Sequence, residues 1–192
     1  MELNLNGLKV EYAHTRPYRG MKLEDIEILH ALHEWKVEAD YSSAIRLLEP
    51  FVRQLEQKED SLANRNKYYR PLSYLKEKLL LWEIKQQVDS VNVGDSVRPY
   101  LKKDMLEGVY CDDGRRTYYW EGNQMINTLI AYRIIKNDPS LCKLKENMQL
   151  YILRTKERGW NTYQASSAVA TVLTDLLAGS GGMSGTSVSV SG

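Results

Sequence analysis

The feature that most constrains the fold is a run of apolar residues between positions 72 and 88. Apolar side chains recur there at helical spacing and cover most of the helix surface: Leu72, Leu75, Leu79, Leu80, Leu81, Trp82, Ile84 and Val88. A helix that is apolar on nearly all sides is usually buried between other helices. The run therefore predicts a central helix enclosed by neighbours, and with it an all-α fold.

Two helices are expected before this run. The first begins near Lys22 and carries an apolar stripe at positions i, i+4, i+7 and i+11, formed by Ile28, Leu32, Trp35 and Ala39. The second begins at the cap residues 40–43, and its own stripe consists of Ile45, Leu48, Val52 and Leu55. Because proline inside a helix removes a hydrogen bond, Pro50 predicts a kink or break near residues 48–49. The polar segment 57–66 indicates a helix end followed by a loop.

The segments after the central run have clear start and stop signals. Ser96 as N-cap, Pro99 in the first turn and Gly108 as terminator predict a helix. Residues 109–120 are β-type sequence around an Asp-Gly turn, which predicts a small β-hairpin or ordered loop.

Three further helices are expected after residue 120. The first carries Met125 and Leu129, the next starts at Asp138-Pro139, and the last opens at Trp160-Asn161-Thr162 and stops at Gly179. Small residues on the last helix predict close packing against a neighbour. In total about seven helices are expected, joined by short turns and mostly paired antiparallel.

Composition excludes several classes of protein. The chain has 192 residues, enough for one domain, and its 26 Lys+Arg balance 25 Asp+Glu, unlike the clustered basic excess of a nucleic-acid binder. No apolar run approaches the roughly 18 residues of a membrane span, and no signal-peptide core follows Met1. The two cysteines are too few for a disulfide scaffold or a zinc ribbon.

The candidate chemical groups each have a simpler structural interpretation. His30 and His33, with Glu27 and Glu34 nearby, resemble half of a di-carboxylate metal motif, but a second copy is absent and a solvated, charged helix face is favoured. Asp112-Asp113 before a glycine indicates a turn. We therefore predict no catalytic residue, no cofactor and no metal ligand, and the protein is not expected to be an enzyme.

The two cysteines are the remaining candidates. Cys111 has no histidine after position 33 to activate it as a nucleophile. A disulfide between Cys111 and Cys142 stays open if the protein is exported.

The order of motifs between Val109 and Ala178 carries a family resemblance. Tyr118-Tyr119-Trp120 precedes a helix, a second helix follows Asn137-Asp138, and Trp160-Asn161-Thr162-Tyr163-Gln164-Ala165-Ser166 opens the last one. This arrangement resembles the closing helices of the helical toroid of bacterial alpha-2-macroglobulin-like proteins. Their signature Trp-x-Thr-Thr-x-Ala-Thr is kept at Trp160, Thr162, Ala165 and Ser166, whereas Tyr163 replaces the second threonine. The family's thioester motif, Cys-Gly-Glu-Gln, is absent from this chain.

The resemblance implies antiparallel helical hairpins that form part of an α/α toroid. It implies a non-catalytic helical domain that contributes to protease trapping or inhibition in the periplasm or cell envelope, without a thioester. The partners would be a protease or neighbouring domains of the same large protein, with no nucleic acid and no transmembrane segment. The candidate interaction or packing residues are Tyr118, Tyr119, Trp120, Trp160 and Thr162.

The resemblance also divides the chain into three parts. Residues 1–20 form a lead-in arm or strand, 21–178 the helical domain, and 179–192 a Gly/Ser linker with the first strand of a following domain, so that the chain is expected to be a fragment or a degenerate member.

Two other interpretations remain open. The chain could be a stand-alone helical module that holds a protein or peptide through a concave face and the loop 110–120. An enzyme on the same toroid, as in terpenoid cyclases or prenyltransferases, would need a carboxylate-rich or Asp-Cys-His metal site, for which only Asp112-Asp113 is present.

Overall fold

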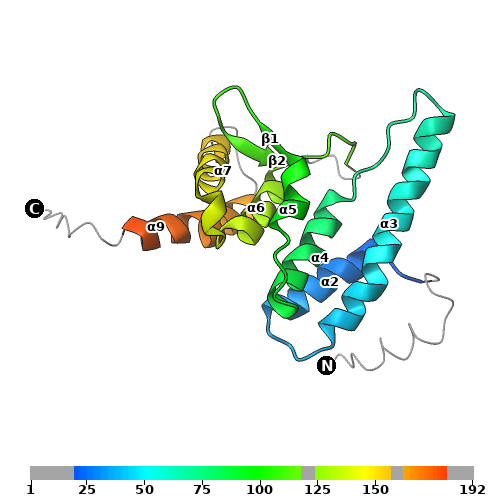
Figure 1. Ribbon diagram of the computed structural model, residues 1–192, viewed down its shortest axis with the longest axis horizontal. Helices are drawn as coiled ribbons and strands as arrows, with labels where there is room; N and C mark the ends of the chain where they lie inside the picture. Colours follow the sequence, from blue (N-terminus) through cyan, green and yellow to red (C-terminus); the bar gives the residue numbers. More distant parts are fainter. Residues whose placement is uncertain (1–19, 118–123, 157–161, 181–192) are drawn as a thin grey trace, which may run out of the picture.

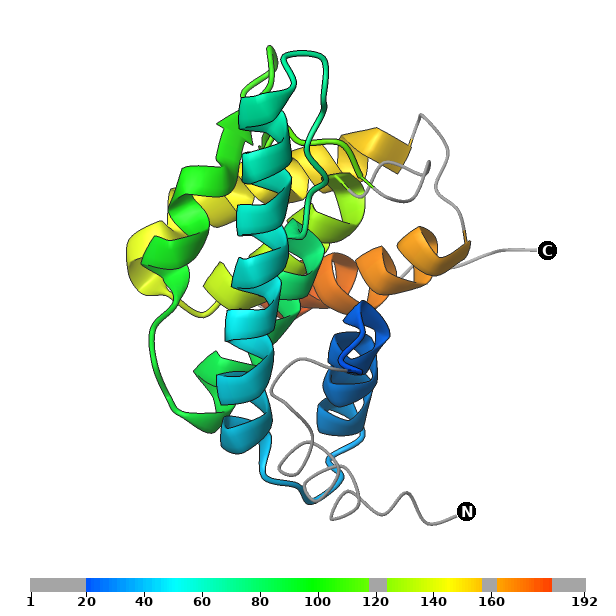
Figure 2. The same ribbon diagram turned by 90° about the vertical axis from the view of Figure 1, so that its right-hand side faces the viewer.

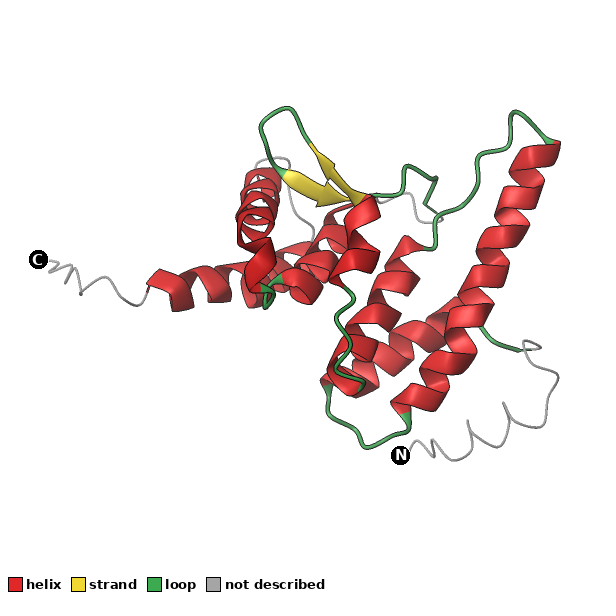
Figure 3. Ribbon diagram, viewed as in Figure 1, coloured by secondary structure: helices red, strands yellow, loops and turns green. Residues whose placement is uncertain are grey.

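The helix predicted from the apolar run, α4 (Leu75–Val88), lies at the centre of the fold. The structure is a computed structural model that describes residues 20–117, 124–156 and 162–180 (Figure 1). Three helices contact α4: α2 (Leu23–Glu34), α3 (Tyr41–Arg65) and α6 (Gln124–Ile135). Its buried apolar residues are Leu75, Leu79, Leu80, Leu81 and Ile84. The all-α class is confirmed, with one small two-stranded sheet among the described residues (Figure 3).

Helix α2 turns a different face toward the core from the one predicted. Ile26, Leu29 and Leu32 are buried, whereas Ile28 is exposed and Trp35, which follows the helix, is 77% exposed. The predicted stripe through Ile28 and Trp35 is therefore wrong. Two apolar stripes compete on this short helix, and the position of α4 decides which one is buried.

Helix α3 is longer than predicted and is not interrupted. Asp40 caps it by accepting a hydrogen bond from the backbone N–H of Ser43 at 3.1 Å. The expected break near residues 48–49 is wrong, because the helix continues through Pro50 to Arg65. The proline costs one backbone hydrogen bond, and the stripe that contains Leu48 and Val52 stays buried on both sides of it. Figure 2 shows α3 running along one side of the fold over nearly its whole height.

The segment predicted as a helix from Ser96 to Gly108 has another structure. It holds one helical turn, α5 (Gly94–Val97), a 3-10 turn, η1 (Arg98–Tyr100), and then strand β1 (Leu101–Lys103). Strand β1 pairs antiparallel with β2 (Val109–Cys111), so that Leu101 faces Cys111. The β-type run at 109 is thus a strand, but its partner precedes it and the hairpin turn lies at 104–108 rather than at Asp112–Gly114.

The next helices begin where the sequence signals place them. In α6 the ring of Tyr132 is fully buried. Asp138 then accepts a hydrogen bond from the backbone N–H of Ser140 at 2.9 Å and caps the 3-10 turn η2 (Pro139–Leu141). Helix α7 (Cys142–Thr155) follows directly and packs on α6 and β2.

The last helical segment contains an irregular middle. It consists of α8 (Thr162–Ala168), a π-helical stretch, η4 (Val169–Leu173), and α9 (Thr174–Ser180). Ala168 is fully buried, and α8 contacts α6. Of the small residues on this segment, Ala168 is buried, whereas Ser166 and Ala170 are exposed. The expected lead-in at 1–20 and the terminal strand at 188–190 lie outside the described residues, except for Gly20.

Candidate functional site

The most deeply buried charged cluster joins helices from three parts of the chain. The side chain of Glu83 on α4 is only 4% exposed and receives two hydrogen bonds from Arg133 on α6, at 2.5 and 2.7 Å. His30 on α2 lies 2.9 Å from the same carboxylate. Burial alone raises the pKa of Glu83, but the hydrogen bonds and charges of Arg133 and His30 outweigh it and lower the pKa to about 2. Glu83 is therefore ionised at neutral pH.

The same cluster has the spacing of a metal site but not the free ligand atoms. One ligand atom from each of His30, Glu34 and Glu83 lies within 4.8 Å of the others. Both oxygens of Glu83 already accept hydrogen bonds from Arg133, so a cation would have to displace a guanidinium. The geometry is that of an ion network that holds α2, α4 and α6 together.

The solvated helix face predicted for the two histidines is wrong for His30, which is half-buried against Glu83. His33 packs edge-on against the ring of Tyr41 at 5.1 Å. Glu27 lies near the surface and pairs with Lys76 at 2.5 Å, as a charged outer face requires. The sequence around His30 could not predict that it pairs with Glu83, because the two residues are 53 positions apart.

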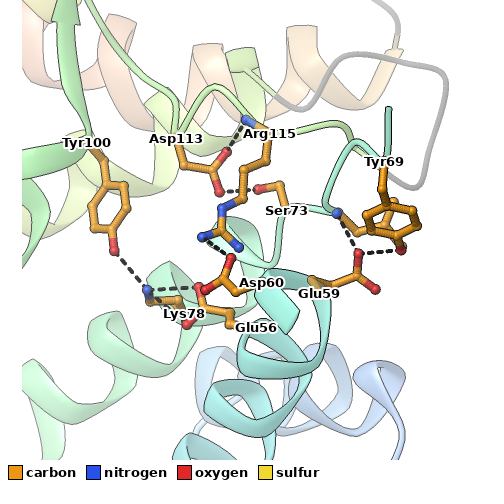
Figure 4. A network of polar contacts seen from close by, with 10 residues as sticks. Glu56, Glu59, Asp60, Tyr69, Ser73, Lys78, Tyr100, Asp113 and Arg115 are labelled. Carbon is orange, nitrogen blue, oxygen red and sulfur yellow. Dashed lines mark hydrogen bonds and ion pairs between the residues drawn. The ribbon is translucent and has the colours of Figure 1, made fainter. Parts of the chain in front are cut away.

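A second polar network ties the end of α3 to the loop that follows it (Figure 4). Glu59 is buried and accepts hydrogen bonds from the hydroxyl of Tyr69 at 2.8 Å and from the backbone N–H of Leu72 at 2.9 Å. The segment 57–66, predicted as a helix end and loop, is helical as far as Arg65, where α3 ends. Glu59 in this segment binds the chain that returns after the helix.

The network continues to the loop after β2 (Figure 4). Asp113 accepts hydrogen bonds from the hydroxyl of Ser73 at 2.7 Å and from the backbone N–H of Arg115 at 3.0 Å. The guanidinium of Arg115 pairs with Asp60 of α3 at 2.9 Å. Asp112 accepts from the backbone N–H of Gly114 at 3.0 Å, which is the turn predicted for this acidic pair.

Lys78 of α4 lies at the other end of the network. Its ammonium group pairs with Glu56 at 3.0 Å, donates to the hydroxyl of Tyr100 at 2.8 Å and lies 5.6 Å from the ring centroid of Trp82. Burial lowers the pKa of Lys78, but the hydrogen bonds and charge of Tyr100 and Glu56 outweigh that effect and raise it. These contacts secure the chain just before β1.

The cysteines are free thiols in different surroundings. Cys111 is buried, and burial together with the charges of Asp112 and Asp113 raises its pKa to about 12. Its thiol is therefore protonated at neutral pH and a poor nucleophile. Cys142 is exposed, and both thiols are free in this structure.

The β-hairpin presents an apolar tip that the sequence did not predict. Met105 is fully exposed and Leu106 is 65% exposed. The carboxylate of Asp104 stabilises the turn by accepting hydrogen bonds from the backbone N–H groups of Leu106 at 2.9 Å and Gly108 at 2.8 Å. It also forms an ion pair with Arg154 of α7.

A tyrosine hydroxyl connects the last helix to the core. Tyr132 receives a hydrogen bond from the amide of Gln149 at 2.7 Å and donates one to Asp175 of α9 at 3.0 Å. Burial, and to a lesser extent the charge of Asp175, raise the pKa of Tyr132 to about 12, so the hydroxyl remains a donor. The sequence does not indicate that the hydroxyl of Tyr132 links α7 to α9, because both of its partners are distant in the chain.

Most of the residues singled out from the resemblance cannot be placed. Tyr118, Tyr119, Trp120 and Trp160 lie outside the described residues. Thr162 is the first residue of α8, and its side chain lies outside the description.

Comparisons with protein-family models, with curated proteins and with solved structures found no match to this chain. Among the residues that the structure describes, none of the helices has the length and apolar character needed to cross a membrane.

Proposed function

We propose that the chain is a non-catalytic segment of a larger helical-hairpin array, the α/α toroid of an alpha-2-macroglobulin-like protein that traps proteases in the cell envelope. The observation that carries the proposal is the exposure of large apolar side chains at the first and last helical segments described. Trp35, which directly follows α2, is 77% exposed, and Leu177 on α9 is 72% exposed. In a longer array such side chains would pack against the next hairpin.

The chemistry of the polar residues supports a structural role. Glu83, Asp113 and Lys78 are each engaged by partners from other segments, and the thiol of Cys111 is protonated. These groups therefore hold segments together and are not free to act on a substrate. The contact between α8 and α6 and the burial of Ala168 are consistent with the helix packing that the resemblance implies.

The test is a protease-trapping assay on the full-length product of the gene that encodes this segment. A protease enclosed by a trap keeps its activity on a small chromogenic peptide but loses activity on a large protein substrate, because only the small substrate can enter. We expect this split between the two activities, and we expect the protein in the envelope fraction of the cell. Equal loss of both activities would indicate a blocked active site, and no loss of either would refute trapping.

A second candidate function is a binding module that uses the hairpin tip, which is favoured by the exposure of Met105 and Leu106. Tyr110, part of the predicted binding loop, is stacked on Tyr151 at 5.2 Å and is half-buried, so it is not a free contact surface. If the tip binds a partner, a pull-down with this chain as bait should lose that partner in the double variant Met105→Ser/Leu106→Ser. The exposed Leu150→Ser on α7 is the matched control. Capture that survives the double substitution would rule out the tip.

A further inference from the structure

An open pocket lies where the C-terminal ends of α4 and α6 meet. Its volume is about 410 Å³. Its walls combine aliphatic and polar side chains, among them Gln86, Val91, Asn92, Ile134, Asn137 and Asp138. The proposed trapping role does not use this pocket.

The electrostatic field at the pocket favours a cation. Helix α4 ends at Val88 and α6 at Ile135, and each helix C-terminus carries a partial negative charge of about half an electron. Asp138 adds a full charge, because hydrogen bonds from Ser140 and Asn92 lower the pKa of its carboxyl group.

The nearby cations form their ion pairs with other carboxylates. The charge of Arg98 helps to lower the pKa of Asp138, but its guanidinium pairs with Asp95 at 3.1 Å, and Lys136 pairs with Asp175 at 3.4 Å. Within the part of the chain that the structure describes, Asp138 forms no ion pair. Its charge is therefore only partly compensated and still attracts a cationic ligand.

A residue of the pocket wall has an unused hydrogen-bond acceptor. The amide nitrogen of Gln86 donates to the carbonyl of Ile134 at 3.0 Å, whereas its Oε1 is buried without a partner among the described residues. A buried acceptor without a donor is destabilising, so a shift of the Gln86 side chain toward a ligand N–H group would be favourable.

The absence of a side chain at Gly94 keeps the approach to the carboxylate open. A Cβ atom there would lie 3.1 Å from the amide oxygen of Asn92 and 3.8 Å from Oδ2 of Asp138. The aliphatic wall formed by Val91 and Ile134 suits a methylene chain. We propose that this pocket binds a basic side chain, lysine or arginine, of a peptide or protein partner. Its stem lies on the aliphatic wall and its head lies between Asp138 and the two helix ends.

The experiment is a titration of the folded chain followed by NMR of backbone amides at 86–94 and 134–138. The probes are Nα-acetyl-lysine methylamide, Nα-acetyl-arginine methylamide and the neutral Nα-acetyl-norleucine methylamide. We expect both cations to bind in the millimolar range, and norleucine about tenfold more weakly. Added salt should weaken the cations only. Equal binding of norleucine, or no shift with either cation, would overturn the proposal.

Single substitutions test which carboxylate attracts the cation. Asp138→Asn keeps a capping side chain and should weaken the cations about threefold to fivefold. Asp95→Asn makes the same change in net charge at an exposed site and should have no effect. Because Asp138→Asn could also disturb the turn, Asn137→Asp provides a second test at an exposed wall position. It should tighten cation binding, and unchanged binding in both pocket variants would refute the site.

Discussion

The ion network around Glu83 makes a quantitative prediction about stability. The pKa of this carboxyl group falls from 4.5 to about 2 in the folded protein, although burial acts in the opposite direction. Each pKa unit corresponds to 1.36 kcal/mol, so ionisation of Glu83 contributes about 3 kcal/mol to folding at neutral pH. That is a large share of the roughly 5–15 kcal/mol by which a typical domain is stable.

The substitution Glu83→Gln imitates the protonated carboxyl group. It should therefore lower the free energy of unfolding by about 3 kcal/mol at pH 7. Because the folded pKa is depressed, the contribution is present above pH 4.5 and is lost as the pH falls toward 2. By linkage the difference between wild type and variant should shrink to about 1 kcal/mol at pH 3.

The assay is urea unfolding followed by circular dichroism at both pH values. Glu107→Gln is the matched control, since its pair with Lys103 is exposed and should be worth less than about 1 kcal/mol. A difference for Glu83→Gln below about 1 kcal/mol at pH 7, or one that is the same at pH 3, would show that the network does not stabilise the fold in this way.

Three other predictions follow from single positions. Gly108→Ala would place a Cβ atom 2.7 Å from Nη2 of Arg154 and 3.1 Å from Cβ of Tyr151; Arg154 must move and loses its pair with Asp104, which should cost about 1 kcal/mol in chemical denaturation, and a neutral result would mean that this pair does not stabilise the hairpin. Titration with a thiol reagent should modify Cys142 at once and Cys111 only on unfolding, because one is exposed and the other buried with a raised pKa; equal rates would contradict this. Burial raises the pKa of Glu77, so wild type loses stability as the pH rises above 4.5. Glu77→Gln should be more stable at pH 7 with no difference below pH 4, and a destabilised variant at pH 7 would reveal an ionised, paired Glu77.

The sequence predicts those parts of the fold that depend on local pattern. The apolar residues of α4 and α6 recur at helical spacing, and caps such as Asp40 and Asp138 begin their helices as expected. The segment 96–108 fails for a physical reason. Its Pro99 and Gly108 have the order of helix start and stop signals, but pairing of Leu101–Lys103 with the later strand is a non-local contact that no local pattern reports.

The candidate sites were less predictable than the helices. Glu83 on α4 and Arg133 on α6 lie 50 residues apart in the sequence, and only the packing of the helices reveals that each is the other's partner. The pocket beside Asp138 arises where two helix ends meet, which depends on loop geometry. The aromatic residues chosen from the resemblance fall mostly outside the described part of the structure, so that prediction stays untested.

The long reach of the Glu83 contacts has a consequence during synthesis on the ribosome. His30 and Arg133 lie 53 and 50 residues from Glu83 along the chain, on opposite sides of it. A nascent chain that has emerged only as far as α4 therefore holds an acidic group in an apolar helix without its guanidinium. The early helices cannot reach their final packing until α6 has left the exit tunnel. Until then they expose apolar surface, which is the state that chaperones recognise and proteases cleave.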